Sequence, residues 1–512
     1  MVWKPVRMQS AEMLSAYLSG DLRAAEARVL AHLPDDTLMK RAAAGLASVC
    51  VEMLREHRGG VNGRRVVLLV GTGNNGGDAL LAGARLRRRG AKVDAVLVGE
   101  DAYGPGLHAV RAAGAGVIGA STSPTGKAAA RSALAAADLV VDGLLGIGGS
   151  VGLVSPADEL VASIPPSALV VAVDLPSGVE PDTGEISGSH VRADVTVTFG
   201  ALKPCLLVPP ASHVVGRVVF VDVGVGDDLS ADAAVQRLTP LGVAARWPVP
   251  QRAAHKYTRG VLGVIAGSDT YPGAAVLVVA GAIRAGVGVV RFIGPPGVTD
   301  HVLSARPEAV PGIGRVQAWL LGSGVEADAD QDKAIDLALD SGLPCVVDAG
   351  ALEACARRRV AGDKPVSADG VLLTPHAGEV ARTLEVLGHA VTRDEVEAQP
   401  MRHALWLARE VDATVLLKGS TTLIADPTGR LLSQNDGPPW LATAGSGDVL
   451  AGIAGALMAA GVNAMDSGAM AALVHGQAGA RASGDGPIAA GDIADHTPST
   501  VADLLRLVAN QR

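Results

Sequence analysis

The chain has 512 residues, roughly three times a common domain length, which argues against one uninterrupted hydrophobic core and predicts two large domains or three small ones. Hydrophobic residues make up 48% and charged residues 19%, a balance that excludes a disordered chain. The net charge of -8 and the aromatic content of only 2% argue against a nucleic-acid partner and against an anionic membrane surface.

Neither export nor membrane insertion is expected. The first residues, MVWKPVRMQSAEM, contain no apolar signal core, and the long apolar stretch at 276–294 is interrupted by Arg284 and Arg291. The cysteines form no CxxC pair, which fits a reducing, cytoplasmic setting. They are Cys50, Cys205, Cys345 and Cys355.

The amino-terminal segment is expected to be helical over residues 8–57, with a break near LPDD and a new start at Thr37. Short Val/Leu runs then alternate with Ala/Arg-rich helical stretches, which predicts a parallel sheet wrapped by helices. The expected strands are 66–70, 93–98, 138–142, 168–174 and 195–199. One helix ends in a cluster of arginines that is read as a solvated face rather than a phosphate clamp. These are Arg85, Arg87, Arg88 and Arg89.

The alternation stops after residue 226, where prolines gather, so a domain boundary is placed near 230–245. A second series of strands and helices begins at 260–267 and continues through AWLLGSG, PCVVDAG, GVLLTPH and ATVLLKG. The predicted domains are therefore residues 1–230 and 245–512, both of the α/β class.

The first half contains a glycine-rich turn, GTGNNGGD at 71–78, directly after a strand and at the start of a helix. Glycines let backbone amides approach a ligand, and a helix N-terminus favours an anion such as a pyrophosphate. Asp142 and Asp174 lie at the ends of two further expected strands, so these clusters are expected to converge on one crevice. Either aspartate alone could instead cap a helix or bind turn amides.

Four segments, GTGNNGGD, VVDGLLGIG, VDLPSGVEPDTGE and TFGALKP, resemble in this order the NAD(P)H-hydrate epimerase family over about residues 35 to 225. The resemblance implies a Rossmann-like three-layer domain in which Asp174 lies beside the nicotinamide ring as the acid/base group. It also implies that two loops hold the hydrated dinucleotide and that a potassium ion has three oxygen ligands. The loop residues are Asn74, Asn75, Gly76, Gly77, Asp78, Gly146 and Gly148, and the potassium ligands are Asn75, Asp142 and Ser177.

One segment departs from the family pattern. The second loop reads GIGGSVG at 146–152, where the family usually has GTG followed by a basic residue. A hydroxyl and a charge are missing, so weaker phosphate contacts are expected in this half. A non-catalytic binding role for the first domain remains an alternative.

In the second half, Ala444-Gly445-Ser446-Gly447-Asp448 opens an apolar helix. Amides of the first turn can neutralise a phosphoryl group in transfer, and Asp448 can accept a proton from an attacking hydroxyl. The structural alternative is an ordinary N-terminal carboxylate on a helix packed through small residues. Another strand leads into a loop whose amides and hydroxyls could hold a nucleotide phosphate. Its residues are Lys418, Gly419, Ser420, Thr421 and Thr422.

Thr374, His376 and Glu379 follow a further strand, although His376 alone would more often be a hydrogen-bonded turn residue. Taken in order, HKYTRG, AGSDTYPGAA, LGSG, VVDAGAL, LTPHAGE, LLKGSTT and ATAGSGDVLAG resemble the ADP- or ATP-dependent NAD(P)H-hydrate dehydratase family over about residues 250 to 505. The resemblance implies a ribokinase-like fold. It places the hydrate against Ala274, Gly324, His376 and Asp448, and the spent nucleotide against residues 418–422 with Gly445 and Gly447.

The implied chemistry is repair of hydrated NADH or NADPH, by epimerisation in the first half and by dehydration driven by magnesium with ADP or ATP in the second. A ribokinase-like vitamin-precursor kinase and a dinucleotide-sensing scaffold are the alternatives. LTPHAGE with YPGAA argues against a sugar kinase, and the presence of Asp174, Lys418 and Asp448 argues against a decayed site. A homo-oligomer is expected because closed assemblies are common.

Overall fold

The computed structural model describes residues 11–34, 36–120, 123–229, 232–326, 328–362 and 370–509. The described residues form two compact units. The first unit lies within Ser15–Ala234. The second lies within Val235–Arg512 and also includes residues 11–14 from the start of the chain. Each unit is an α/β structure with its own sheet and core, as the sequence predicts.

Among the described residues the first unit has a seven-stranded sheet in the order β4-β3-β2-β5-β6-β7-β8, and all neighbouring strands are parallel. The strands are β2 (Arg65–Val70), β3 (Lys92–Leu97), β4 (Gly116–Gly119), β5 (Leu139–Gly143), β6 (Leu169–Val173), β7 (Val195–Phe199) and β8 (Arg217–Val221). The helices are α1 (Ser19–Leu30), α2 (Thr37–Arg58), α3 (Asn74–Arg88), α4 (Gly104–Ala112), α5 (Pro124–Ala135) and α6 (Ala157–Val161).

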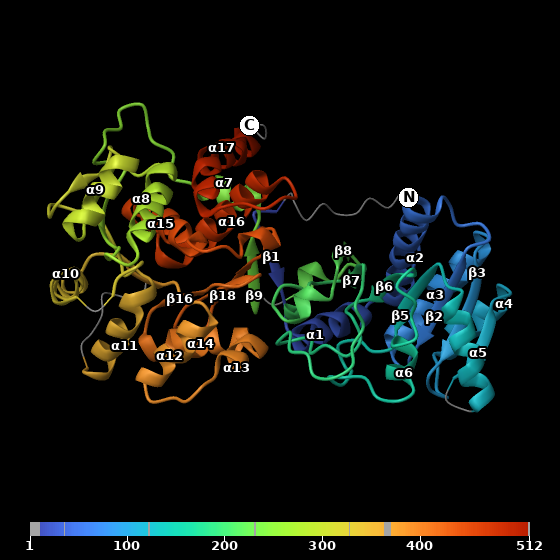
Figure 1. The fold of residues 1–512 in the computed structure, drawn as a ribbon. Coiled ribbons are helices and arrows are strands. Elements are labelled where there is room, and N and C mark those ends of the chain that lie inside the picture. Colours follow the sequence, from blue (N-terminus) through green and yellow to red (C-terminus); the bar gives the residue numbers. More distant parts are fainter. Residues whose placement is uncertain are drawn as a thin grey trace. The chain divides into compact units, whose positions relative to one another are not determined.

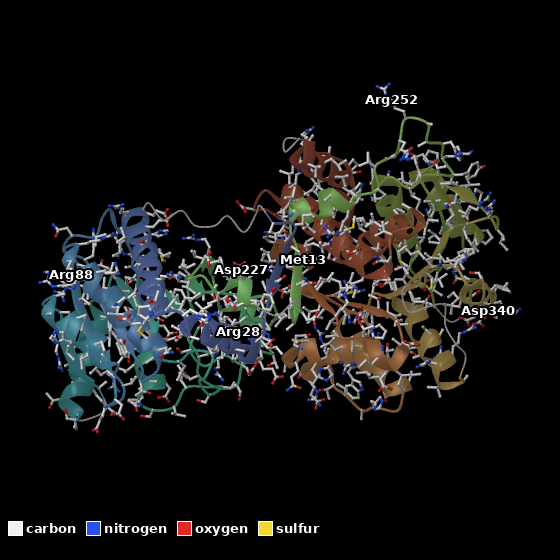
Figure 2. The ribbon with its side chains drawn as sticks, turned by 180° about the vertical axis from the view of Figure 1, so that it is seen from behind. Met13, Arg28, Arg88, Asp227, Arg252 and Asp340 are labelled. Atoms are coloured by element: carbon white, nitrogen blue, oxygen red, sulfur yellow. The ribbon has the colours of Figure 1, made fainter. Side chains whose placement is uncertain are left out.

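Both faces of this sheet are covered by helices, which confirms the expectation from its continuous apolar strands. Along β2, Leu68 belongs to a core shared with α2 and α3, whereas Leu69 belongs to a core shared with α5 and α6. The result is three layers, in which α2 and α3 lie beside β2 and β5 (Figure 1). At the end of α3, Arg88 is exposed at the surface of its unit (Figure 2).

The strand order places a crevice between β2 and β5. From β2 the chain proceeds to β3 and β4 on one side, and then returns to β5 and continues outward on the other side. Ligands in open α/β sheets bind at such a switch point, beyond the carboxyl ends of the strands. The glycine-rich turn follows β2, and Asp142 lies near the end of β5.

The second unit has, within the described part of the chain, an eleven-stranded sheet in the order β1-β9-β18-β17-β16-β15-β14-β13-β10-β11-β12. The run from β16 to β12 is parallel, and β17 is antiparallel to both β16 and β18. The strands are β1 (Met13–Ala16), β9 (Val235–Leu238), β10 (Val261–Ile265), β11 (Val289–Ile293), β12 (Val310–Pro311), β13 (Ala318–Leu321), β14 (Cys345–Val347), β15 (Val371–Leu373), β16 (Thr414–Leu417), β17 (Thr422–Ala425) and β18 (Leu431–Gln434).

Helices cover both faces of this sheet as well. One face packs against α8, α15 and α16, and Figure 1 shows α11, α12 and α14 on the other. The helices are α7 (Pro240–Arg246), α8 (Pro272–Arg284), α9 (Pro296–Ala305), α10 (Ala329–Asp340), α11 (Leu352–Val360), α12 (Ala377–Val386), α13 (Arg393–Ala398), α14 (Pro400–Val411), α15 (Ser446–Ala459), α16 (Ala464–Ser483) and α17 (Ala490–Ala509).

Two glycines allow α8 and α15 to pack closely. A Cβ atom on Gly281 would lie 2.5 Å from the carbonyl oxygen of Val449, and one on Gly452 would lie 2.3 Å from that of Val278. Any larger residue at these positions would push the helices apart. Because Asp448 lies in the first turn of α15, this packing fixes where its carboxylate can point.

The structure differs from the sequence expectation at the start of the chain. Residues 13–16 form β1, labelled by Met13 in Figure 2, although 8–57 was expected to be helical. Residues 8–10 lie outside the described residues. A four-residue edge strand is too short for its alternation to be read from sequence. No described helix is long and apolar enough to cross a membrane.

Candidate functional sites

The glycine-rich turn of the first unit brings backbone segments into close approach. A Cβ atom on Gly71 would lie 1.9 Å from the carbonyl oxygen of Leu144, so only glycine allows the turn after β2 to meet the turn after β5. Gly146 has a related role, because a Cβ atom there would lie 2.5 Å from the side-chain oxygen of Asn75. Gly76 and Gly77 lie buried in the first turn of α3.

Asn75, Asp142 and Ser177 come together beneath this turn. The Ser177 hydroxyl donates to Asp142 Oδ1 at 2.7 Å, and its backbone amide donates to Oδ2 at 2.8 Å. The Asn75 side-chain amide donates to the carbonyl oxygens of Val173 at 2.6 Å and Leu145 at 3.1 Å. The three residues expected to hold a cation therefore form one buried, oxygen-rich cluster.

The charge of this cluster is compatible with a monovalent cation. Asp142 has no exposed surface, and no ion pair is found for it in the described part of the chain. Burial raises the pKa of Asp142 to about 6, although hydrogen bonds from Ser177 and Leu144 act in the opposite direction. A cation would offset the cost of this buried negative charge.

Asp174 follows β6 in the left-handed backbone region, with a φ of 70° that few residues other than glycine adopt. Its Oδ1 accepts hydrogen bonds from the Thr198 hydroxyl and the Phe199 amide, both at 3.2 Å, and from the Lys203 ammonium group. Lys203 is completely buried and also donates to the carbonyl oxygen of Phe199 at 3.1 Å. The strained backbone and the buried cation together fix this carboxylate.

Two further carboxyl groups lie within electrostatic reach of Asp174. Asp78 Oδ1 is buried without a hydrogen-bond partner. Burial raises the pKa of Asp78 well above its usual range, and the charges of Asp174 and Glu26 raise it further. Burial also raises the pKa of Glu26, against the opposing effect of Lys203. The buried Asp78 carboxyl is therefore protonated more readily than an exposed aspartate.

A cavity of about 460 Å³ opens above this group of residues. Asn74, Asn75, Gly146 and Gly148 are among the residues that line it. Six expected residues are buried and do not line it, namely Gly76, Gly77, Asp78, Asp142, Asp174 and Ser177. The cavity is also lined by Arg23 and Glu26, both on α1.

In the second unit, four neighbouring strands each end in a residue of one polar network. Asp348, after β14, accepts hydrogen bonds from the hydroxyls of Ser323 and Thr374, both at 2.8 Å. It also accepts one from the Lys418 ammonium group at 3.0 Å. These donors follow β13, β15 and β16, so the carboxyl ends of adjacent parallel strands converge on Asp348.

Lys418 and Asp448 face each other across this network. A Cβ atom on Gly447 would lie 3.4 Å from Lys418 Nζ, which places the lysine against the first turn of α15. Burial lowers the pKa of Lys418, but Asp348, Glu379 and Asp448 raise it more strongly, so the lysine stays charged. Burial and then Asp348 raise the pKa of Asp448 to about 7, against lowering by Lys418 and Ser323.

The remaining expected residues lie around the same strand ends. Gly324 has a φ of 67° and a Cβ atom on it would lie 2.6 Å from Cβ of Ala274, so these two residues are in contact. Gly445, with a φ of 85°, precedes α15. Gly419 and Ser420 are exposed in the turn between β16 and β17, whereas Thr421 is buried and Thr422 begins β17.

His376 caps α12, and its side chain accepts a hydrogen bond from the Glu379 amide at 3.2 Å while the Glu379 carboxylate accepts one from the His376 amide at 2.7 Å. Its ring is half exposed. Burial lowers the pKa of His376. The neutral imidazole of His376 therefore caps the helix and also leaves part of its ring accessible to a ligand.

Five residues of these sites were not predicted from the sequence. They are Lys203, Asp348, Ser323, Arg23 and Glu26. Asp348 carries the same signal as Asp142, an aspartate at the carboxyl end of a buried strand, and this signal could have identified it. Lys203 lies in the TFGALKP segment but nothing in the sequence shows that it is buried. Arg23 and Glu26 lie on a helix with no recognisable motif.

Comparison with known families divides the chain in the same way. Residues 35–205 match the family described as YjeF-related protein N-terminus, and residues 262–498 match the family described as NAD(P)H-hydrate dehydratase.

Similar proteins cover nearly the whole chain. A bifunctional NAD(P)H-hydrate repair enzyme from Mycobacterium leprae is 43% identical over 501 residues, covering 95% of this chain and 99% of the relative. One with the same description from Mycobacterium tuberculosis is 45% identical over 460 residues, covering 87% and 89%. A crystal structure of the ADP/ATP-dependent NAD(P)H-hydrate dehydratase from Bacillus subtilis, co-crystallised with ATP and Mg²⁺, is 25% identical and covers 52% of this chain and 97% of its own, with a TM-score of 0.45.

Proposed function

The chain belongs to the family of bifunctional NAD(P)H-hydrate repair enzymes, and from this premise we propose how its residues divide the work. Residues 1–230 are assigned to epimerisation of the R and S hydrates, and residues 245–512 to nucleotide-driven dehydration of the S hydrate. Residues 11–14 contribute to the second unit. The observation that carries this assignment is that each unit has one group of buried carboxylates at the carboxyl ends of its parallel strands.

At the first site, Asp174 and Asp78 act as a base and an acid on the hydrated ring. Hydration leaves a hydroxyl on the carbon beside the ring nitrogen. As the nitrogen lone pair forms a double bond to that carbon, the carbon–oxygen bond breaks, and the hydroxyl leaves as water with the Asp78 proton. Water then adds to the opposite face and gives a proton to a carboxylate. Asp174, which accepts a hydrogen bond from Lys203, is the carboxylate assigned to take up this proton.

Asn74, Asn75, Gly146 and Gly148, which line the cavity, are assigned to binding the dinucleotide, with the amides of Gly76 and Gly77 at the start of α3. Asn75, Asp142 and Ser177 are assigned to potassium, for which the buried, unpaired charge of Asp142 is the supporting observation. Bound there, potassium would neutralise that charge and hold the turns after β2 and β5 together.

At the second site, Asp448 removes the proton from the hydroxyl of the S hydrate. The hydroxyl oxygen forms a bond to the terminal phosphorus of ATP or ADP, and the bond from that phosphorus to the departing nucleotide breaks. The ring nitrogen then expels phosphate, and loss of a proton from the neighbouring carbon restores the double bond of the reduced cofactor. Phosphate is therefore the leaving group in place of hydroxide, because hydroxide leaves poorly.

The first turn of α15, including Gly445 and Gly447, is assigned to the transferring phosphoryl group, and Lys418 with residues 419–422 to the nucleotide. The contact of Lys418 with this turn supports the assignment. Ala274, Gly324 and His376 are assigned to the hydrate. The described residues contain no group of three acidic, histidine or cysteine side chains that could hold a metal. Magnesium would therefore be bound mainly by the nucleotide phosphates, whose charge it would reduce.

The assignment predicts a specific result with purified full-length protein. A mixture of R and S hydrates with ATP should recover all of the reduced-nicotinamide absorbance, with one nucleotide consumed per cofactor. Nucleotide consumption without recovery would indicate a small-molecule kinase, and binding without either would indicate a scaffold. We also propose a homo-oligomer, tested by sedimentation, and a cytoplasmic location, supported by four buried free thiols.

A further inference from the structure

The cavity of the first unit contains a positive charge that its two motif loops do not supply. Its lining comprises residues of the glycine-rich turn, residues 144–149 of the second loop, and two side chains from α1. Within that lining, Arg23 is the only cationic side chain. The loops themselves offer only backbone amides and uncharged side chains.

Arg23 is held in place by its helix. At the start of α1, the amide and hydroxyl of Ser19 donate to Asp182 Oδ1 at 2.7 and 2.8 Å. The next turn buries Leu22, which is 1% exposed, in the core of the first unit. The backbone of Arg23 is therefore held by a helix that packs on the core, and its exposed side chain lines the cavity.

The guanidinium group of Arg23 reaches the second loop. Its Nη2 donates to the carbonyl oxygen of Ile147 at 2.8 Å. A Cβ atom on Gly148 would lie 3.1 Å from the same nitrogen, so glycine at this position leaves room for the arginine. A positive charge beside this loop is thus supplied from a different element of the fold.

Most of the hydrogen-bonding capacity of Arg23 is unused. A guanidinium group has five N–H donors in a planar fork that matches phosphate oxygens. One contact, to Ile147, is found for it among the described residues, and no ion pair. Glu26, one turn further along α1, lines the same cavity. Burial raises the pKa of Glu26, which weakens its competition for the arginine.

We propose that Arg23 binds the pyrophosphate of the hydrated dinucleotide, together with the amides at the start of α3. This inference rests on the proposed epimerase site and names its phosphate ligand. The arginine supplies the cavity with a positive charge that the GIGGSVG loop does not itself contain. The first site then binds its substrate through a charged hydrogen bond as well as through backbone amides.

The test compares two substrates in the full chain. With Arg23→Gln, the KM for epimerisation of the hydrated dinucleotide should rise about tenfold or more, the usual effect of losing a charged hydrogen bond. The KM for hydrated nicotinamide riboside, which has no phosphate, should not change. Arg23→Lys should restore part of the loss for the dinucleotide. Dehydration of the pure S hydrate by the second unit measures the integrity of each preparation.

Arg28→Gln is the matched control, since Arg28, labelled in Figure 2, lies on the same helix. It is absent from the lining of the cavity. This variant should leave both KM values unchanged. An equal rise for both substrates with Arg23→Gln would show that the arginine only supports the loop, and no rise would show that it has no part in binding. Either result overturns the proposal. Failure of the unmodified protein to epimerise would instead reject the proposed function itself.

Discussion

Lys203 donates a hydrogen bond to Asp174 from a position with no exposed surface, and this is the only cation found to pair with that carboxylate among the described residues. A lysine is buried at a cost of several kcal/mol unless its charge is compensated. Each charge of the pair therefore compensates the other, and the hydrogen bond orients the proposed acid/base group.

Replacing Lys203 with Met should destabilise the first unit by about 3 kcal/mol, because it leaves the Asp174 charge buried and unpaired. It should also abolish epimerisation. Urea unfolding measures the first effect, and adding Asp174→Asn to the variant should recover part of the stability. Arg28→Met, which removes an exposed ion pair with Asp228, should cost less than about 1 kcal/mol. Equal losses for the two single variants would refute this account of Lys203.

The pH dependence of dehydration should follow the ionisation of Asp448. The pKa of Asp448 is raised to about 7, so the carboxyl is neutral below that pH and can act as a base only above it. The kcat/KM for the S hydrate should therefore fall about tenfold per pH unit on the acidic side. Ser323 lowers this pKa, so Ser323→Ala should shift the acidic limb to higher pH. A limb that does not move, or a profile that is flat across this range, would count against the assignment.

Potassium should act on the first unit alone. In the unmodified protein, replacing sodium with potassium should raise the melting temperature of the first unit and the rate of epimerisation. With Asp142→Asn the buried charge is gone, and both responses should disappear. Dehydration by the second unit serves as the internal reference. The cation assignment fails if the Asn variant still responds.

The close packing of α8 and α15 should be essential to dehydration. A Cβ atom on Gly452 would lie 2.3 Å from a backbone oxygen of α8, so Gly452→Ala should destabilise the second unit by about 1–3 kcal/mol and displace Asp448. Epimerisation should be unaffected. Gly491→Ala, on α17 with no neighbour within 4 Å, is the matched control. Normal dehydration by the Gly452 variant would mean that this packing does not position the helix.

The sequence predicted the sheets well because parallel strands buried on both faces are continuous apolar runs. The run expected at 66–70 is β2 at Arg65–Val70, and the one at 195–199 is β7 at Val195–Phe199. Asp142 and Asp174 could be placed together because the carboxyl ends of parallel strands meet at one edge. The families expected from the two sets of motifs are confirmed.

The charged partners could not be predicted in the same way. Lys203 is far from Asp174 in sequence, and a lysine is read as exposed by default. Arg23 lies on α1, which carries no motif, and its importance follows only from the packing of that helix beside the second loop. The strand β1 was not predicted because its four residues are too few to show the alternation of apolar and polar residues that indicates a strand.

The most direct test of the account is the initial rate at which pure S hydrate regains reduced-nicotinamide absorbance with ATP when Asp448 is changed to Asn. The amide keeps the shape of the carboxyl but cannot accept the proton, so the rate should fall about a thousandfold. Epimerisation of R hydrate by the same preparation should be unchanged. A rate within about a factor of two of that of the unmodified protein would contradict the claim that Asp448 is the base of the dehydration. Such a difference is much smaller than the about tenfold change that one pKa unit represents.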